Sequence, residues 1–236
     1  MTDKVWAVVP AAGIGKRMQA EIPKQYLPLH GRMVIEHTLS RLLGHVRIAG
    51  VMVALAEGDP LWPRVSLPRG TPLYTAPGGA ERCESVHNAL QRLDQYAAPT
   101  DWVMVHDAAR PCLRRQDIDA LIAGIPPDEC GGILALPVRD TMKRAQPGST
   151  RIYQTVAREG LWHALTPQIF RLEDLRQALS NALKIGEFVT DEAQAMELAG
   201  GHPLLIEGHA DNIKITRPED LALADLYLKQ QEETCE

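Results

Sequence analysis

A loop of small residues and cations is the clearest chemical signal in the sequence. Residues 10–18 read PAAGIGKRM; they follow an apolar run at 5–9 and lead to the motif PKQY at 23–26. Small residues let a ligand approach main-chain N–H groups closely. Three nearby cations, Lys16, Arg17 and Lys24, suit a triphosphate approached by a second anion. We therefore expect phosphate chemistry here; a turn with solvated charges is the structural alternative, which the position at a strand end disfavours.

Two better-known glycine loops do not fit these residues. The dinucleotide-binding fingerprint requires a third glycine where Met18 stands, which disfavours an oxidoreductase. The P-loop requires glycine in place of Pro10 and Ser or Thr in place of Arg17. The loop therefore indicates a nucleotide site of another kind.

A carboxylate follows a second apolar run. Asp107 comes directly after DWVMVH at 101–106, which has the composition of a buried strand. Mg²⁺ prefers carboxylate, phosphate and water oxygens, so Asp107 is the first candidate metal ligand. A helix cap or a salt bridge with Arg110 is the structural alternative. His106 lacks a partnered serine or cysteine motif, so we expect a packed, hydrogen-bonded histidine and no catalytic triad.

The elements that must position these residues alternate between strands and helices. Apolar runs predict four buried strands, at residues 5–9, 50–55, 101–106 and 131–138. Helical spacing predicts three helices between or beside them, at residues 34–43, 85–93 and 118–125. This order predicts an α/β fold with a mostly parallel sheet flanked by helices, whose ligands lie beyond the carboxyl ends of the strands.

Two later segments carry signals for the start of a helix. Thr216 is expected to cap a helix that runs to Leu228, with Pro218 and Glu219 in its first turn. Its leucines are expected in the core: Leu221, Leu223, Leu226 and Leu228. Thr190 is expected to cap a second helix, and we assign the TDEA segment that it opens to structure and not to catalysis.

A polar stretch near residues 138–160 predicts a hairpin arm. Pro147-Gly148-Ser149 lies between two strand-like segments at 141–143 and 151–155. An isolated two-stranded arm is marginal in water. We therefore expect the arm to lean on a second subunit, and the chain, residues 1–236, to form one domain.

Composition excludes several partners. The net charge is -5 and no Lys/Arg run is longer than two, so we expect no binding to nucleic acid or to an anionic membrane. No apolar run approaches the ~20 residues that span a bilayer, and no signal peptide is evident. The 4 cysteines show neither zinc-site nor disulfide spacing, which favours a cytoplasmic protein.

Taken together, these motifs resemble the methylerythritol phosphate cytidylyltransferases. The small-residue loop with Arg17 and the PKQY motif carry the resemblance, and further matches extend over nearly the whole chain, at residues 78–79, 82, 85–86, 105–111, 137–143, 161–168, 190–193 and 207–214. The resemblance implies a nucleotidyltransferase, Rossmann-like fold. It also implies magnesium, CTP and a small polyol phosphate as cofactor and substrates, and a homodimer interlocked by the hairpin.

The resemblance assigns roles that single motifs leave open. Arg17, Lys24 and Lys214 surround the reacting phosphates in this reading, and Asp211 assists Asp107 in holding the metal. Taken alone, the DNIK segment at 211–214 would more often be a turn.

The resemblance also implies how the nucleotide is bound. The matching positions hold cytosine mostly through main-chain groups, with the ribose near the last of them: Pro10, Ala11, Ala12, Gly13, Gly79, Ala80, Ser85 and Ala108. Ala80 departs from relatives that carry aspartate there, and a main-chain contact at this position would tolerate the change.

For the polyol phosphate, the matching positions are Thr141, Arg158 and Thr166, with Arg110 nearby. Arginine suits a phosphate because its fork donates two charge-assisted hydrogen bonds. Taken alone, Thr166 would be a helix cap and Arg158 a solvated charge. Because the family's hairpins interlock, Thr141 and Arg158 are expected to serve the partner's site.

The expected reaction joins CMP from CTP to 2-C-methyl-D-erythritol 4-phosphate and releases pyrophosphate, in non-mevalonate isoprenoid synthesis. One alternative is a cytidylyltransferase for another polyol phosphate, such as ribitol 5-phosphate, since only the acceptor pocket separates the two. Another is a module that senses CTP without turnover, which the retained Arg17, Lys24, Asp107 and Lys214 disfavour.

Overall fold

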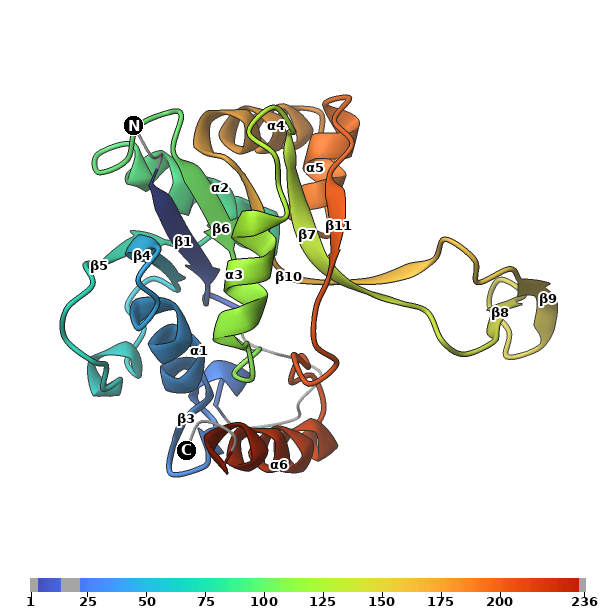
Figure 1. The fold of residues 1–236 in the computed structure, drawn as a ribbon, viewed down its shortest axis with the longest axis horizontal. Coiled ribbons are helices and arrows are strands. Elements are labelled where there is room, and N and C mark those ends of the chain that lie inside the picture. The colour runs from blue at the N-terminus through green and yellow to red at the C-terminus, as the bar shows by residue number, and fades with distance from the viewer. Residues whose placement is uncertain (1–3, 14–21, 234–236) are drawn as a thin grey trace.

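A seven-stranded sheet forms the centre of the chain, whose computed structural model describes residues 4–13 and 22–233 (Figure 1). Its strands run in the order β11-β7-β10-β6-β1-β4-β5. Their bounds in chain order are β1 Val5–Pro10, β4 Ile48–Leu55, β5 Leu73–Pro77, β6 Trp102–Val105, β7 Gly131–Pro137, β10 Trp162–Arg171 and β11 Leu204–Glu207. Only β10 pairs antiparallel with its neighbours, β6 and β7. The predicted mostly parallel sheet is confirmed.

All four predicted strands are present, as β1, β4, β6 and β7. Sequence patterns did not reveal β5, β10 or β11. β10 carries Pro167 and several polar residues, and its pairing with β7 is interrupted between Ala164 and Gln168. A proline and a mixed polar pattern both argue against a strand, which is why the sequence did not predict β10. In the structure, Gln168 to Arg171 nevertheless pair with β6.

Helices cover both faces of the sheet (Figure 1). α1 (Val34–Leu43) and α3 (Arg115–Ala123) pack on one face, where Leu39, Leu42 and Leu121 are fully buried. α2 (Arg82–Leu93), α4 (Leu172–Lys184) and α5 (Glu192–Leu198) pack on the other, where Leu90 and Leu179 are fully buried. The three predicted helices are confirmed as α1, α2 and α3, whereas α4 was not predicted.

The last helix, α6 (Pro218–Glu233), lies against the turn formed by β2 (Pro28–Leu29) and β3 (Arg32–Met33). Its start differs from the prediction, because the Asp220 carboxylate accepts hydrogen bonds from the Thr216 N–H, the Thr216 hydroxyl and the Arg217 N–H. Leu228 is buried as expected. Leu223 and Leu226 are not in the core of this chain; they are 40% and 49% exposed.

The cap of α5 also differs from the prediction. Asp191, and not Thr190, is the N-cap residue: its side chain accepts a hydrogen bond from the Gln194 N–H. The Thr190 hydroxyl bonds to the Gln194 side chain instead. The Asp191 carboxylate, one residue later than predicted, therefore accepts a hydrogen bond from a backbone N–H group in the first turn of α5, and Thr190 lies just before the cap.

The predicted hairpin is present and projects from the body (Figure 1). It consists of β8 (Met142–Ala145) and β9 (Ile152–Val156), which pair antiparallel with each other. Ile152 and Tyr153 are 63% and 65% exposed on it. Within this chain the arm therefore leaves apolar side chains uncovered.

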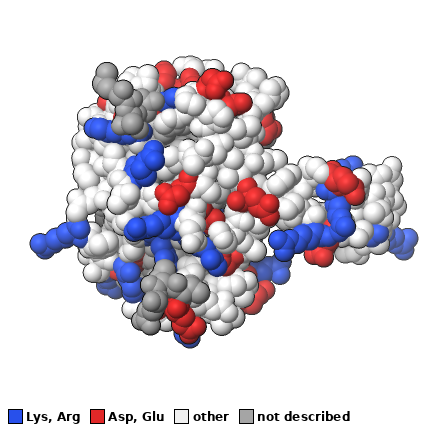
Figure 2. Space-filling model, viewed as in Figure 1, with Lys and Arg blue, Asp and Glu red and all other residues white. Residues whose placement is uncertain are grey.

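Charges of both signs are interspersed over the face that Figure 2 shows, and the arm carries both. In the part of the chain that the structure describes, no helix has the length and apolarity to cross a bilayer. Three of the cysteines, Cys83, Cys112 and Cys130, are free thiols.

Candidate active site

The loop after β1 forms one wall of the site. The Ala11 N–H donates to the Ala54 carbonyl at 2.8 Å, which continues the pairing with β4 beyond the end of β1. Gln25 lies in the short helix η2 (Lys24–Tyr26), and its amide donates to the carbonyls of Ala11 at 2.6 Å and Gly13 at 3.1 Å. These bonds turn the loop inward. Lys16 and Arg17 lie outside the described residues.

The turn before α2 forms the facing wall. A Cβ atom on Gly78 would lie 2.3 Å from the Cβ of Ala12, so only glycine lets the two walls come this close. The Ser85 hydroxyl accepts from the Gly79 N–H at 2.9 Å and donates to the Glu81 carbonyl at 3.1 Å. Ser85 therefore fixes the turn that carries Gly79 and Ala80.

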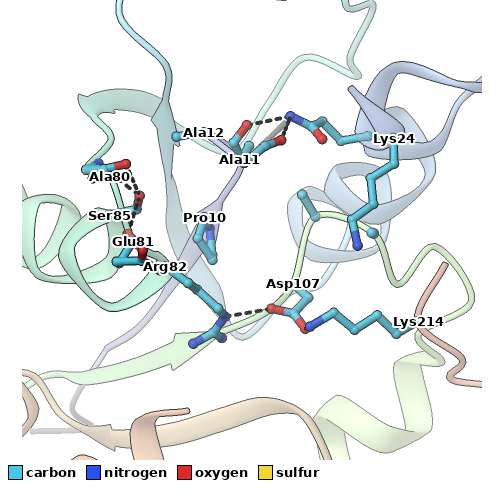
Figure 3. A pocket seen from close by; sticks show the side chains of 15 residues that line it. Pro10, Ala11, Ala12, Lys24, Ala80, Glu81, Arg82, Ser85, Asp107 and Lys214 are labelled. Atoms are coloured by element: carbon cyan, nitrogen blue, oxygen red, sulfur yellow. Dashed lines mark hydrogen bonds and ion pairs between the residues drawn. The ribbon is translucent and has the colours of Figure 1, made fainter. Parts of the chain in front are cut away.

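A cavity of about 270 Å³ lies between these walls (Figure 3). All of the predicted nucleotide-binding positions line it: Pro10, Ala11, Ala12, Gly13, Gly79, Ala80, Ser85 and Ala108. Three of the predicted phosphate and metal residues line it as well: Lys24, Asp107 and Lys214. The strand ends thus bring together main-chain groups, cations and one buried carboxylate.

Three cations surround the Asp107 carboxylate at the end of β6. Arg82 Nε lies 2.9 Å from Oδ1, Lys214 Nζ lies 2.7 Å from Oδ2, and Arg110 Nε lies 3.6 Å from Oδ2. Figure 3 shows Arg82 and Lys214 reaching it from opposite sides. Burial alone would raise the pKa of Asp107, but these charges hold it far below its usual range. Asp107 is therefore ionised, and the salt bridge with Arg110 left open by the sequence is one of its three contacts.

The cations are positioned by main-chain contacts from several segments. Lys24 Nζ donates to the Ile215 carbonyl at 2.9 Å. The Ile215 N–H in turn donates to the Ala109 carbonyl at 2.9 Å, and Arg110 donates to the Asn212 carbonyl at 2.7 Å. The segment before α6 is thereby held against the end of β6, which places Lys214 beside Asp107.

His106 and Thr166 form a buried pair behind Asp107. His106 Nε2 lies 3.1 Å from the Arg110 carbonyl, which can only accept, so Nε2 carries the proton. Nδ1 then accepts from the Thr166 hydroxyl at 3.0 Å, and that hydroxyl accepts from the Asp107 N–H at 3.1 Å. Burial lowers the pKa of His106 to about 4, which keeps the ring neutral. The prediction of a packed histidine is confirmed.

A second, smaller cavity of about 150 Å³ adjoins the first. Two predicted substrate residues, Arg110 and Thr166, line it. Thr190 and Asp191 line it as well, although the sequence predicts only a structural role for them. Arg82, Asp107 and Lys214 line both cavities. These three charged side chains therefore form the wall where the contents of the two cavities would meet.

Three predicted residues lie away from both cavities. The Asp211 carboxylate accepts from Arg114 Nε and from the Gln231 amide, each at 2.8 Å, and this placement does not support a metal-binding role beside Asp107. Thr141 and Arg158 belong to the hairpin arm, where the Arg158 guanidinium bonds to the Arg139 carbonyl. Neither residue lines either of the two cavities described here.

Comparison with known proteins decides the family. The family model described as 2-C-methyl-D-erythritol 4-phosphate cytidylyltransferase matches residues 5–230. The chain belongs to this family. This cytidylyltransferase is 53% identical to the protein of that name from Vibrio vulnificus, over 99% of this chain and 98% of the relative. It is 51% identical to the one from Escherichia coli, over 95% of this chain and 93% of the relative.

Solved structures agree with the fold of this cytidylyltransferase. It superposes on a 4-diphosphocytidyl-2C-methyl-D-erythritol synthase with a TM-score of 0.83 and 37% identity, covering 96% of this chain and 100% of that one. The cytidylyltransferase from Thermus thermophilus gives a TM-score of 0.76 at 32% identity, covering 96% and 99% of the two chains. The nucleotidyltransferase fold that the resemblance implies is confirmed.

The donors of the cytidylyltransferase suit a metal that the substrate helps to hold. The described residues contain no cluster of three or more His, Cys, Asp or Glu side chains able to form an all-protein metal site. Mg²⁺ is commonly held by one or two carboxylates together with substrate phosphates and water. Asp107 fits this arrangement, because it is ionised, lines the cavity, and as a carboxylate has about four acceptor positions for its contacts.

Proposed function

We propose that the chain transfers CMP from CTP to 2-C-methyl-D-erythritol 4-phosphate, giving 4-diphosphocytidyl-2-C-methyl-D-erythritol and pyrophosphate in non-mevalonate isoprenoid biosynthesis. The observation that carries the proposal is the shared wall of Arg82, Asp107 and Lys214 between two cavities of unequal size. A nucleotidyl transfer requires a nucleotide and an acceptor phosphate to meet at one phosphorus atom. The names of the relatives supply the two substrates.

The larger cavity takes CTP in this proposal. Its walls offer main-chain groups at Ala11, Ala12 and Gly79 for the base, and Ala108 lies where the ribose is expected. The triphosphate then extends toward Lys24 and Lys214, with Arg17 assigned to the same group by its place in the loop. Preorganised cations of this kind stabilise charge on the α-phosphate and on the departing pyrophosphate.

The smaller cavity takes the acceptor. Arg110 and Lys214 provide charge for its phosphate. The Thr166 oxygen keeps one acceptor position for a substrate hydroxyl, because the Asp107 N–H takes only one of its two. A phosphate monoester has its second pKa near 6 and is largely ionised at neutral pH. The acceptor phosphate is therefore the nucleophile without a dedicated general base, and catalysis rests on positioning and charge compensation.

Asp107 is the proposed ligand of a magnesium ion. When bound there, such an ion would supply positive charge that neutralises part of the charge on the substrate phosphates. Asp107 contributes an ionised carboxylate at the wall shared by both cavities, and Lys214 and Arg82 keep that carboxylate oriented.

We further propose a homodimer in which each arm completes the partner's acceptor site. Thr141 and Arg158 lie on an arm that projects away from its own cavities and exposes Ile152 and Tyr153. Mixing two inactive variants, R158A and K214A, tests this arrangement. Mixed dimers restore one intact site only if Arg158 acts in trans, so activity should reappear on mixing. Continued inactivity of a mixture that is shown to exchange subunits would contradict it.

The protein is expected to act in the cytoplasm. Cys83, Cys112 and Cys130 are free thiols, and a reducing compartment keeps thiols in this state.

Pyrophosphate release tests the proposed function. CTP is offered with 2-C-methyl-D-erythritol 4-phosphate or with ribitol 5-phosphate, with Mg²⁺ or with chelator, and other nucleotides serve as controls. The proposal predicts Mg²⁺-dependent release with CTP and the methylerythritol substrate. Release with ribitol phosphate alone would overturn the acceptor, and CTP binding without any release would indicate a sensor module.

A further inference from the structure

We infer that Glu192 is a positioning residue for this reaction, acting on Asp107 through Arg82; the inference rests on the proposed function. Glu192 lies in the first turn of α5, is 1% exposed, and lines neither cavity. The sequence pattern around it indicates only the start of a helix.

The Arg82 guanidinium is held from two sides. Its Nη1 and Nη2 donate to the two carboxylate oxygens of Glu192 at 2.7 and 3.1 Å, and its Nε donates to Asp107 Oδ1 at 2.9 Å. A bidentate contact between arginine and a carboxylate fixes the plane of the fork as well as its position. Glu192 therefore determines which edge of Arg82 faces Asp107 (Figure 3 shows the Arg82–Asp107 bond).

Glu192 is itself fixed to the sheet by its neighbours. The Gln168 side chain on β10 accepts from the Ala193 N–H at 2.9 Å and donates to Asp191 Oδ2 at 3.0 Å. The residues on both sides of Glu192 are thus pinned to the strand that also carries Thr166. A continuous set of contacts therefore runs from β10 through α5 and Arg82 to Asp107. It holds the Asp107 carboxylate in place from the side of the sheet, in addition to the contact that Lys214 makes with it.

The charges of Glu192 and Arg82 give this ion pair a role beyond packing. Among the described residues, Asp107 and Glu192 are the carboxylates that form ion pairs with these three cations, so without Glu192 the ion pairs of all three would fall to Asp107. Glu192 offsets one of them, and it occupies the Arg82 nitrogens that would otherwise be available to CTP phosphates. Buried ion pairs are weak evidence for stability, and removing one partner leaves the other charge uncompensated. We conclude that Glu192 keeps Arg82 committed to Asp107 and away from the nucleotide.

The test compares E192Q, which keeps the shape and removes the charge, with E197Q, which removes an exposed charge on the same helix. For E192Q we expect kcat at least tenfold lower than in the wild type. We also expect several-fold tighter binding of CTP in the absence of divalent ions, measured by calorimetry, because the released Arg82 charge attracts the triphosphate. E197Q should match the wild type in both. Destabilisation of α5 alone would not tighten CTP binding.

A double variant shows whether Glu192 acts through Arg82. If it does, R82Q/E192Q should have the same kcat as R82Q alone, whereas independent effects would multiply. Should E192Q fail to fold, E192D, which keeps the charge but shortens the reach, should still lower kcat while leaving metal-free CTP affinity unchanged. Wild-type kcat in folded E192Q, or multiplying effects in the double variant, would overturn the inference. An inactive wild type would instead overturn the proposed function, and the inference with it.

Discussion

Removing the Lys214 ammonium should reduce turnover far more than it reduces stability. Lys214 Nζ lies 2.7 Å from Asp107 Oδ2 at the wall that both cavities share. A unit charge about 4 Å from a charge that develops in the transition state contributes about 4 kcal/mol at an effective dielectric constant near 20. One decade of rate corresponds to about 1.4 kcal/mol, which gives an upper value near 10³-fold. The Lys214 side chain is 35% exposed, so screening lowers the expectation to roughly 10²-fold.

The assay is steady-state pyrophosphate release by K214Q, with K229Q as the matched control. Lys229 also pairs with an aspartate, at 2.5 Å from Asp225 Oδ2, but lies on α6 away from both cavities. K214Q should melt close to the wild type, because Arg82 and Arg110 still compensate Asp107. A folded K214Q with kcat within a factor of about three of the wild type would refute the reasoning, since that factor is under ~1 kcal/mol.

Three further outcomes are expected. K24A and R17A should each lower kcat by ~10²-fold or more in the same assay, because both cations are assigned to the reacting phosphates; near-normal turnover in both would refute those roles. T166V should lower the unfolding free energy in urea by roughly 1–3 kcal/mol, because the Asp107 N–H and His106 Nδ1 lose their partner, whereas T166S should not. The lowered pKa of His106 makes the unfolded chain bind more protons between pH 6.5 and 4, so stability falls as pH falls through that range. Between pH 7 and pH 5, His106 should account for about 2 kcal/mol of the loss in unfolding free energy. The variant H106Q should lose about that much less stability over the same range. An equal loss in H106Q and the wild type would contradict this role of His106.

Local patterns placed two segments of the proposed nucleotide site at the ends of strands, and the structure brings both to one cavity. The loop at 10–13 and the carboxylate Asp107 each follow a predicted strand, and the ends of parallel strands meet at one edge of a sheet. Gly79 was predicted from the resemblance alone, because β5, the strand before it, was not predicted. Helical and apolar periodicity also predicted α1, α2 and α3 close to their observed bounds. These features depend on residues that are near one another in the chain.

Long-range contacts account for what the sequence did not reveal. Thr166 resembled a helix cap because its neighbours are Pro167 and polar residues, yet antiparallel pairing of β10 with β6 brings it beside Asp107. The bond between Arg82 and Glu192 joins residues 110 positions apart, and no local pattern signals it. Asp211 followed the family pattern, but Arg114 and Gln231 approach it from distant segments and engage its carboxylate.

The exposed leucines of α6 were predicted wrongly for a different reason, which is local. Leu221, Ala224 and Leu228 share the face of α6 that packs against the body. At 3.6 residues per turn, Leu223 and Leu226 lie on the opposite side of the helix, so their predicted place in the core was wrong. Periodicity indicates that a helix has an apolar face and does not say how wide the surface beneath it is.

The fate of the phosphorus atoms of CTP shows directly whether CMP is transferred to the acceptor phosphate. CTP labelled at the α-phosphorus and CTP labelled at the γ-phosphorus are incubated separately with 2-C-methyl-D-erythritol 4-phosphate, Mg²⁺ and the protein. The α label should appear in a cytidine-containing diphosphate product and the γ label in pyrophosphate. Appearance of the γ label in the polyol product, or of the α label only in free CMP, would contradict transfer of CMP to the acceptor phosphate.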